Sequence, residues 1–275
     1  MVGDDMRWLV SLDDEWKVTG KLALSAIDTM VNNRTPWNVK ADFESIASFN
    51  FEDTDYLLVL SSGSMVNSRD TAHIIRLGDS LTSYKKNIRD LYEDIKSLAG
   101  IPDNNEINIE GLAVSNSAAY LFHRGNVYEN FFVEIQLNSL MNYLLSGNNN
   151  LPAMKIYKVD LPDYKEIPSG FSGACFMPDQ SAILYTASLE DTDSELYDGE
   201  ILGSFIGYIP LDKLDAGVSF ASLLKDKNDL PINKKLESIV IKSVSDNKLL
   251  VLSVSDNDDG SSDIFEMNVY LNNLD

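Results

Sequence analysis

One four-residue phrase recurs along the chain: an apolar residue, a glutamate, a serine or glycine, and a second apolar residue. The full copies are Phe43-Glu44-Ser45-Ile46, Ile109-Glu110-Gly111-Leu112 and Leu236-Glu237-Ser238-Ile239, with a degraded copy at Phe171-Ser172-Gly173-Ala174. Each copy opens an apolar run that favours a β-strand and is followed by a second such run, so each copy predicts a hairpin. Repeat units that hold several short strands are typical of propeller blades, whereas solenoids use shorter units or pairs of helices.

We therefore predict an all-β protein, a β-propeller of about five blades, in one domain over residues 1–275. About six blades are expected instead if a whole unit is missing upstream. The first blade is predicted to be incomplete, because Met1-Val2-Gly3 has the pattern of a strand end and the following strands lie near residues 8–12 and 21–24. Closed propellers commonly complete the last blade with a strand from the other end of the chain, and the last repeat here has no outer strand. We expect the chain to be truncated at its N-terminus.

A helical insertion is predicted near residues 80–99. Apolar residues recur there at three- and four-residue spacings, which is the pattern of an amphipathic helix. They are Leu81, Tyr84, Ile88, Leu91, Ile95 and Leu98. Asp79 or Ser80 is expected to cap the start of this helix, and Gly100 suits the left-handed residue that ends it. A second, short helix is expected around residues 139–145.

The charge of the chain limits its partners. The formal net charge is −21, which excludes nucleic acid because phosphate binding needs clustered Lys and Arg. A cation, a small-molecule ligand or a protein partner fits better, and so large a charge favours a soluble monomer. A single cysteine, Cys175, excludes a disulfide framework and a multi-cysteine zinc site. The sequence has no apolar run of about 20 residues and no export leader, so both the cytoplasm and the cell envelope stay open as locations.

The repeated glutamates predict a metal site. In a blade the innermost strand lines the channel and the next strand returns to the same rim, so Glu44, Glu110 and Glu237 are expected to converge there. Residues at the paired position are Asp4, Asp5, Ser64, Arg124, Asn126, Glu190, Asp191 and Asp256. Carboxylates that converge in a narrow funnel must raise their pKa values or recruit a cation, and oxygen ligands favour calcium. The predicted calcium ligands are Glu44, Glu110, Glu237, Asp256 and Asp5, and the predicted ligand-binding residues are Arg124, Asn126, Glu190 and Asp191.

A structural role for the same glutamates is the alternative. They would then accept hydrogen bonds from backbone amides, or pair with Lys40, Lys235 and Arg124, and hold one blade to the next. Spacing alone leaves both interpretations open.

Several of these motifs resemble those of a known group of proteins. The motifs are Lys40-Ala41-Asp42-Phe43-Glu44, Asn108-Ile109-Glu110-Gly111 with Arg124-Gly125-Asn126, Ser188-Leu189-Glu190-Asp191 with Asp198-Gly199-Glu200, and Lys235-Leu236-Glu237. Together they resemble an uncharacterised family of bacterial propellers related to the esterase-like phytase-domain and SdiA-regulated propellers. The resemblance spans nearly the whole chain and implies a calcium ion at the glutamate ring more firmly than it implies a reaction. The family's first inner strand has no counterpart here.

Two other acidic segments are weaker candidates. Residues 255–260 with Glu266 have the Gly and Glu spacing of a calcium-binding EF-hand loop, but the flanking residues favour strands, so a turn is the better interpretation. Residues 190–200 carry six carboxylates and form either a second cation site or a solvated loop.

Catalytic groups are few, and two function classes remain. His73 lies in a strand pattern, whereas His123 precedes Arg124 at the rim and is the better general base. Arg124 would clamp an anionic substrate or form a salt bridge to Glu110. The favoured function is a calcium-binding propeller with an acidic face for a ligand or partner. The alternative is a metal-dependent hydrolase of an ester, lactone or phosphoester, with His123, Arg124 and Glu110 as candidate catalytic residues.

Overall fold

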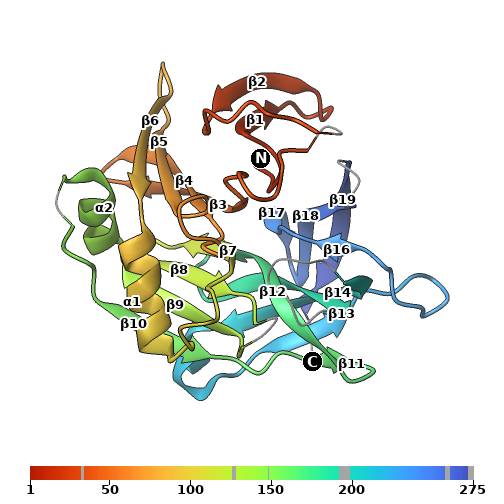
Figure 1. Ribbon diagram of the computed structural model, residues 1–275. Helices are drawn as coiled ribbons and strands as arrows, with labels where there is room; N and C mark the ends of the chain where they lie inside the picture. The colour runs from red at the N-terminus through yellow and green to blue at the C-terminus, as the bar shows by residue number, and fades with distance from the viewer. Residues whose placement is uncertain (32–33, 126–127, 148, 192–198, 258–260, 272–275) are drawn as a thin grey trace. The chain divides into compact units, whose positions relative to one another are not determined.

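The computed structural model describes residues 1–31, 34–125, 128–147, 149–191, 199–257 and 261–271. The chain divides into two compact units, which are described separately below. Unit 1 is Met1–Ile109 with Asn138–Pro152, and unit 2 is Glu110–Leu137 with Ala153–Asp275. Antiparallel sheets built from strands that follow one another along the chain dominate both units (Figure 1). Such sheets are propeller blades in form, so the fold is β-propeller-like and mostly β, as predicted.

Unit 1 contains two sheets. The first is a hairpin of β1 (Trp8–Leu12) and β2 (Val18–Ala23), and the second runs through β3 (Phe43–Phe51), β4 (Thr54–Ser61), β5 (Thr71–Arg76) and β6 (Thr82–Asn87). Two helices complete this unit, α1 (Arg89–Ala99) and nearly all of α2 (Leu137–Leu145). The hairpin is the incomplete first blade that the sequence predicts. Met1 and Val10 exchange two backbone hydrogen bonds of 2.9 Å beside it.

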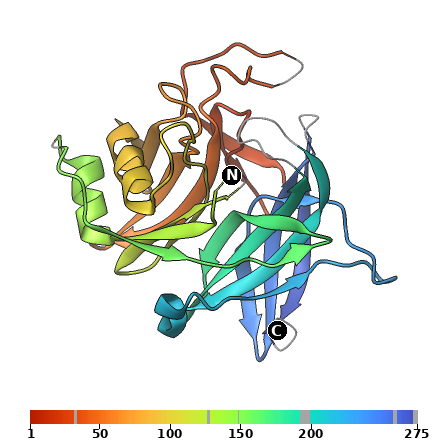
Figure 2. The same cartoon turned by 60° about the horizontal axis from the view of Figure 1, so that its bottom comes forward.

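Unit 2 contains three sheets, seen from a second direction in Figure 2. The first is formed by β7 (Ile109–Val114), β8 (Ala118–His123), β9 (Phe131–Gln136) and β10 (Met154–Lys158). The second is formed by β11 (Asp163–Tyr164), β12 (Ile167–Phe176), β13 (Ala182–Asp191), β14 (Glu200–Pro210) and β15 (Phe220–Leu223), with the 3₁₀ helix Leu211–Ala216 after β14. The third is formed by β16 (Lys235–Leu236), β17 (Val240–Ser245), β18 (Lys248–Asp256) and β19 (Ser262–Tyr270). Among the described residues, four sheets have the size of a blade, and the predicted first blade is represented only by the β1–β2 hairpin.

The predicted helix over residues 80–98 is wrong in its first half. Residues Thr82–Asn87 form β6, which pairs with β5 along its whole length, and the helix starts only at Arg89. Leu81 and Tyr84 fit a helical spacing, but the rest of residues 82–87 is polar, and pairing with β5 decides their local structure. The Asn87 side chain accepts a hydrogen bond from the Arg89 amide, so neither Asp79 nor Ser80 caps the helix. The end is as predicted, with Gly100 left-handed at φ 77°.

The apolar residue that opens each repeat is an anchor in a core. Phe43, Ile109, Phe171 and Leu236 are all buried. In unit 2, Phe171 packs edge to face on Phe122 with ring centroids 5.0 Å apart. In unit 1, Phe43 belongs to a cluster with Leu9, Val59 and Ile75. Burying such side chains fixes the position of the residue that follows each of them, which is the repeated glutamate or its serine substitute.

Neither helix is a candidate membrane span. Within the described residues, α1 has 11 residues and α2 has 9, and no helix combines the length and the apolar character needed to cross a bilayer.

Candidate cation site and buried ion-pair network

The repeated glutamate stands at an irregularity in its strand. In the β3–β4 ladder Phe43 faces Ser61 and Ser45 faces Leu60, so Glu44 is an extra residue between them. The degraded copy has the same defect, because the β12–β13 register shifts between Phe171 and Gly173, around Ser172. A β-bulge of this kind bends the strand and turns one side chain away from its regular direction. Two copies of the repeat therefore place a bulge at the residue that directly follows the buried anchor, at Glu44 and at Ser172.

Three carboxylates of unit 1 come together next to this bulge. Asp4, Asp42 and Glu44 each place one oxygen within 4.8 Å of the others. Asp42 is the most enclosed, with 4% of its side chain exposed, and its backbone has a left-handed φ of 56°. Left-handed conformations are uncommon outside glycine, although aspartate tolerates them better than most residues. The turn before β3 thus holds Asp42 against the start of the chain.

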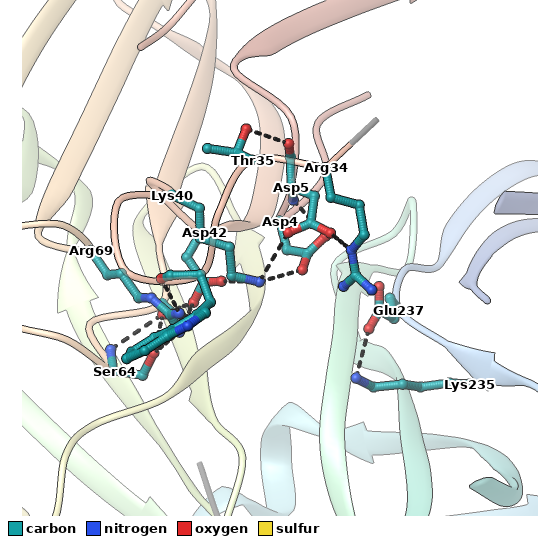
Figure 3. Close-up of polar contacts among 12 residues, drawn as sticks. Asp4, Asp5, Arg34, Thr35, Lys40, Asp42, Ser64, Arg69, Lys235 and Glu237 are labelled. Carbon is teal, nitrogen blue, oxygen red and sulfur yellow. Dashed lines mark hydrogen bonds and ion pairs between the residues drawn. The ribbon is translucent and has the colours of Figure 1, made fainter. Parts of the chain in front are cut away.

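The ammonium group of Lys40 lies among these carboxylates (Figure 3). Its Nζ is 2.5 Å from Asp4 Oδ2, 2.9 Å from Asp42 Oδ1 and 3.4 Å from Asp5 Oδ1. Burial alone would lower the pKa of Lys40, but the carboxylates of Asp42, Asp4 and Glu44 outweigh that effect and raise this pKa above its ordinary value. Lys40 is therefore a charged resident cation of the cluster.

The second oxygen of Asp42 is fully occupied by other groups. Arg69 Nη1 donates to Asp42 Oδ2 at 2.8 Å, and the hydroxyls of Ser62 and Ser64 also donate to this oxygen. Arg69 Nη2 donates to the Trp37 carbonyl at 3.0 Å, which ties the turn to the loop before β5. Oδ1 of Asp42, by contrast, is buried and accepts no hydrogen bond from the described residues, so its contact is the ion pair with Lys40.

Asp5 adjoins the three clustered carboxylates, with its Oδ1 3.4 Å from Lys40 Nζ, but it is also held by the loop before β3. Its side chain forms an ion pair with Arg34, and the Thr35 hydroxyl donates to its backbone carbonyl at 2.8 Å. The loop before β3 thus fixes the N-terminal turn through Asp5 and leaves Asp4 directed at Lys40 and Asp42. Asp5 is a less suitable cation ligand than Asp4, because one of its oxygens already pairs with a guanidinium.

The donor set of unit 1 fits a hard divalent cation. Calcium binds oxygens at about 2.3–2.6 Å, so two oxygens on one ion are at most about 5 Å apart. The spread of 4.8 Å among Asp4, Asp42 and Glu44 meets this limit. All three ligands are carboxylates, which is a set that suits calcium and not copper or structural zinc.

Unit 2 contains a different arrangement, a buried ion-pair network. Arg124, with 1% of its side chain exposed, donates to Glu110 at 2.8 Å and also to Glu190. Lys235 Nζ lies 3.1 Å from Glu237 and 3.8 Å from Glu190. Ion pairs of alternating sign therefore connect β7, the end of β8, β13 and β16. Glu110 and Glu237 are brought into one network, as the repeat predicts, but with two cationic side chains between them.

The pKa shifts in unit 2 have the signs of stable ion pairs. Burial alone would lower the pKa of Arg124, yet Glu110 and Glu190 raise it above its usual range. Burial would likewise raise the pKa of Glu190, but Lys235 and Arg124 lower it. Burial opposes the charge on Lys235 too, while Glu237, Glu110 and Glu190 raise the pKa of Lys235 well above its ordinary value. All these groups stay charged at neutral pH.

A family model places the chain among known sequences. The model described as "Family of unknown function (DUF6929)" matches residues 1–269. The chain belongs to this family. No curated protein matches it. Membership covers nearly the whole described chain and assigns no activity, so the function has to be argued from the two clusters.

The other residues singled out by sequence either adjoin the network of unit 2 or lie outside the described residues. His123 is buried and stacks on Phe131, with ring centroids 4.5 Å apart. Asp191 is exposed at the end of β13, and Asp256 faces Lys235 in the β16–β18 ladder. Asn126 lies outside the described residues, as do residues 192–198 and 258–260 of the two acidic segments. The strands expected on either side of residues 255–260 are present as β18 and β19.

Sequence reasoning did not include Asp42 among the candidate ligands and did not place Lys40 at the centre of the cluster. A signal for Asp42 exists two residues before each repeated glutamate or its serine substitute. The residues there are Asp42, Asn108, Gly170 and Lys235. The side chain at this position is therefore acidic in the first copy, an amide in the second, missing in the glycine of the third and basic in the fourth. That change distinguishes the surroundings of Glu44 from those of Glu237.

Proposed function

We propose that this protein is a propeller-like binding protein that takes up a divalent cation, calcium, through Asp4, Asp42 and Glu44 in unit 1. The observation that carries the proposal is the convergence of three carboxylate oxygens within 4.8 Å. The expected ring of three repeated glutamates is replaced in this proposal by one repeated glutamate with two aspartates. The resemblance to calcium-binding propellers supports the same cation.

The glutamates of unit 2 serve a structural role in this proposal. Glu110 and Glu190 share Arg124, while Glu237 has Lys235 at 3.1 Å. Arg124 and Lys235 both contact Oε2 of Glu190, so a metal ion there would meet two positive charges at one oxygen, whereas Lys40 and Arg69 contact different oxygens of Asp42. The network therefore holds strand ends together, which is the alternative role that the sequence leaves open.

The acidic character of the chain supports a binding role for the whole protein. A net charge of −21 attracts cationic and basic molecules and raises their rate of encounter. We propose that the partner is a small ligand or a protein that meets this acidic face. The hydrolase alternative gains nothing from its candidate residues, because His123 is buried against Phe131 and Arg124 is engaged by two glutamates.

Calcium titration by calorimetry tests the proposal. Chelator-treated protein should bind calcium, and Asp42→Asn or Glu44→Gln should weaken that binding at least about tenfold, since each removes a charged ligand. Glu110→Gln is the matched control, a repeated glutamate in the other unit, and should bind calcium as the wild type does. Absence of binding to the wild type, or equal loss in Glu110→Gln, would reject the site in unit 1.

A further inference from the structure

We propose that Lys40 is a built-in competitor for the calcium site, so that its ammonium group and a calcium ion occupy the same space in turn. This inference rests on the proposed function. It concerns how the site is regulated, namely that calcium must displace an internal cation before it binds.

The distances place the two cations in the same position. Lys40 Nζ is 2.5 Å from Asp4 Oδ2 and 2.9 Å from Asp42 Oδ1. A calcium ion bound to those oxygens would lie about 2.3–2.6 Å from each. An ion so placed would overlap Nζ, and the two positive charges would repel strongly at that separation. Calcium and the ammonium of Lys40 therefore exclude each other.

The hydrogen bonding of Asp42 supports an exchange. Its Oδ2 is held by Arg69 and two serines, whereas the buried Oδ1 accepts no hydrogen bond from the described residues and only faces the ammonium. The hydrogen bonds to Oδ2 fix the whole carboxylate, and the lone pairs of Oδ1 are not used in hydrogen bonding. Oδ1 is therefore pre-organised for a metal ion. Displacement of Lys40 breaks its ion pair with this oxygen and its hydrogen bond to Asp4 Oδ2, and calcium would contact both oxygens in its place.

Lys40 has a route away from the cluster. Its side chain is 12% exposed, and a lysine stem has four rotatable bonds, so the ammonium can swing out to water. Arg69 and Arg34 stay in place during such a movement, because each is held by further contacts. Calcium would then replace the single positive charge of Lys40 with two, while Arg69 and Arg34 stay in place.

Lys235 in unit 2 provides the contrast. It also lies between carboxylates, at 3.1 Å from Glu237 and 3.8 Å from Glu190, but Arg124 neutralises the same Glu190. Arg124 and Lys235 contact the same oxygen of Glu190, Oε2, so removal of Lys235 would leave a guanidinium on the oxygen that an incoming ion needs, whereas Arg69 contacts Oδ2 of Asp42 and not Oδ1. We therefore expect calcium to displace Lys40 and to leave Lys235 in place.

Calorimetry on Lys40→Met tests the competition. Methionine keeps much of the stem and removes the charge, so calcium affinity should rise at least about tenfold over the wild type. Without calcium the variant should melt below the wild type, because its carboxylates lose their counter-ion, and calcium should raise its melting temperature more than it raises that of the wild type. Lys242→Met is the control, since Lys242 forms an exposed pair with Glu266, and should leave affinity unchanged.

The outcomes separate this inference from the proposed function. Wild-type binding with unchanged or weaker binding in Lys40→Met would overturn the competition and leave the calcium site standing. Absence of binding in both proteins would overturn both proposals.

Amine labelling of the wild-type protein covers the case in which Lys40→Met does not fold. Mass spectrometry after limited acetylation should show Lys40 labelled several-fold faster in calcium than in chelator, because the ion releases its ammonium. Lys235 should be labelled equally slowly in both. Equal labelling of Lys40 in the two conditions, with calcium bound, would contradict the inference.

Discussion

Single charged side chains determine what each carboxylate cluster can do. In unit 2, Arg124 and Lys235 balance three glutamates and stay charged, because their neighbours raise the pKa of both. In unit 1, Arg69 contacts Oδ2 of Asp42 and Lys40 contacts Oδ1, so Oδ1 is directed at the space that Lys40 fills. The same residue type, glutamate in a repeat, thus has a structural role in one place and is a proposed ligand in the other.

Replacement of Arg124 should be strongly destabilising. Arg124→Met leaves Glu110 and Glu190 buried without their guanidinium, and breaking a buried pair from one side costs about 3–5 kcal/mol. Urea unfolding at pH 7 measures this loss. Lys242→Met removes an exposed pair and should cost less than about 1 kcal/mol. Equal costs for the two variants would show that the network in unit 2 contributes little.

His73 should make the protein less stable in mild acid. Burial, helped by the charge of Lys85, lowers the pKa of His73 to about 4, whereas the unfolded chain titrates near its ordinary value of 6.5. The unfolded state therefore binds the proton first, and stability falls as pH decreases from 6.5 towards 4. Between pH 7 and pH 5 this group should cost about 2 kcal/mol. Urea unfolding at both pH values should show a smaller loss for His73→Gln than for the wild type, and an equal loss would contradict the assignment.

At the scale of strands and helices, the repeat predicts the hairpins correctly, whereas the three- and four-residue apolar spacing predicts α1 only in part. The buried anchors Phe43 and Phe171 and the strands after them follow from an apolar pattern that has no rival interpretation. Residues 80–98 have a pattern that fits helix and strand, and pairing of β6 with β5 decides between them. Such pairing joins residues that the local sequence does not connect, so it could not be foreseen. The bulge at Glu44 could not be predicted either, because it arises in the pairing of β3 with β4.

The junction after β4 should be sensitive to a single methyl group. Gly63 has φ 84°, and a Cβ there would lie 2.5 Å from Ile107 Cγ2 and 2.7 Å from Tyr92 Cδ2. Gly63→Ala combines a left-handed backbone with overpacking against α1, so it should destabilise unit 1 by roughly 2–4 kcal/mol. Gly78→Ala, where a Cβ would meet nothing within 4 Å, is the matched control. Thermal unfolding that lowers both melting temperatures equally would contradict this packing.

At the scale of the whole molecule, the chain is a β-propeller-like member of a family of unknown function, with charge organised differently in its two units. The repeat predicted the fold class, because a copy of it lies near the start of each blade-sized sheet, while the net charge of −21 led us to expect cationic partners. The ligand set could not be predicted, since Asp4 and Asp42 are brought to Glu44 by the loop before β3, whose path depends on Arg34, Thr35 and Arg69. The proposed calcium site is thus a tertiary feature.

A crystal grown with calcium tests the central claim most directly, through an anomalous difference map recorded at long wavelength. We predict one strong peak within about 2.6 Å of oxygens of Asp4, Asp42 and Glu44, with the Lys40 ammonium turned out of the cluster. A peak at Glu110 or Glu237 instead, or no peak at Asp42 while Lys40 keeps its ion pairs, would contradict the account.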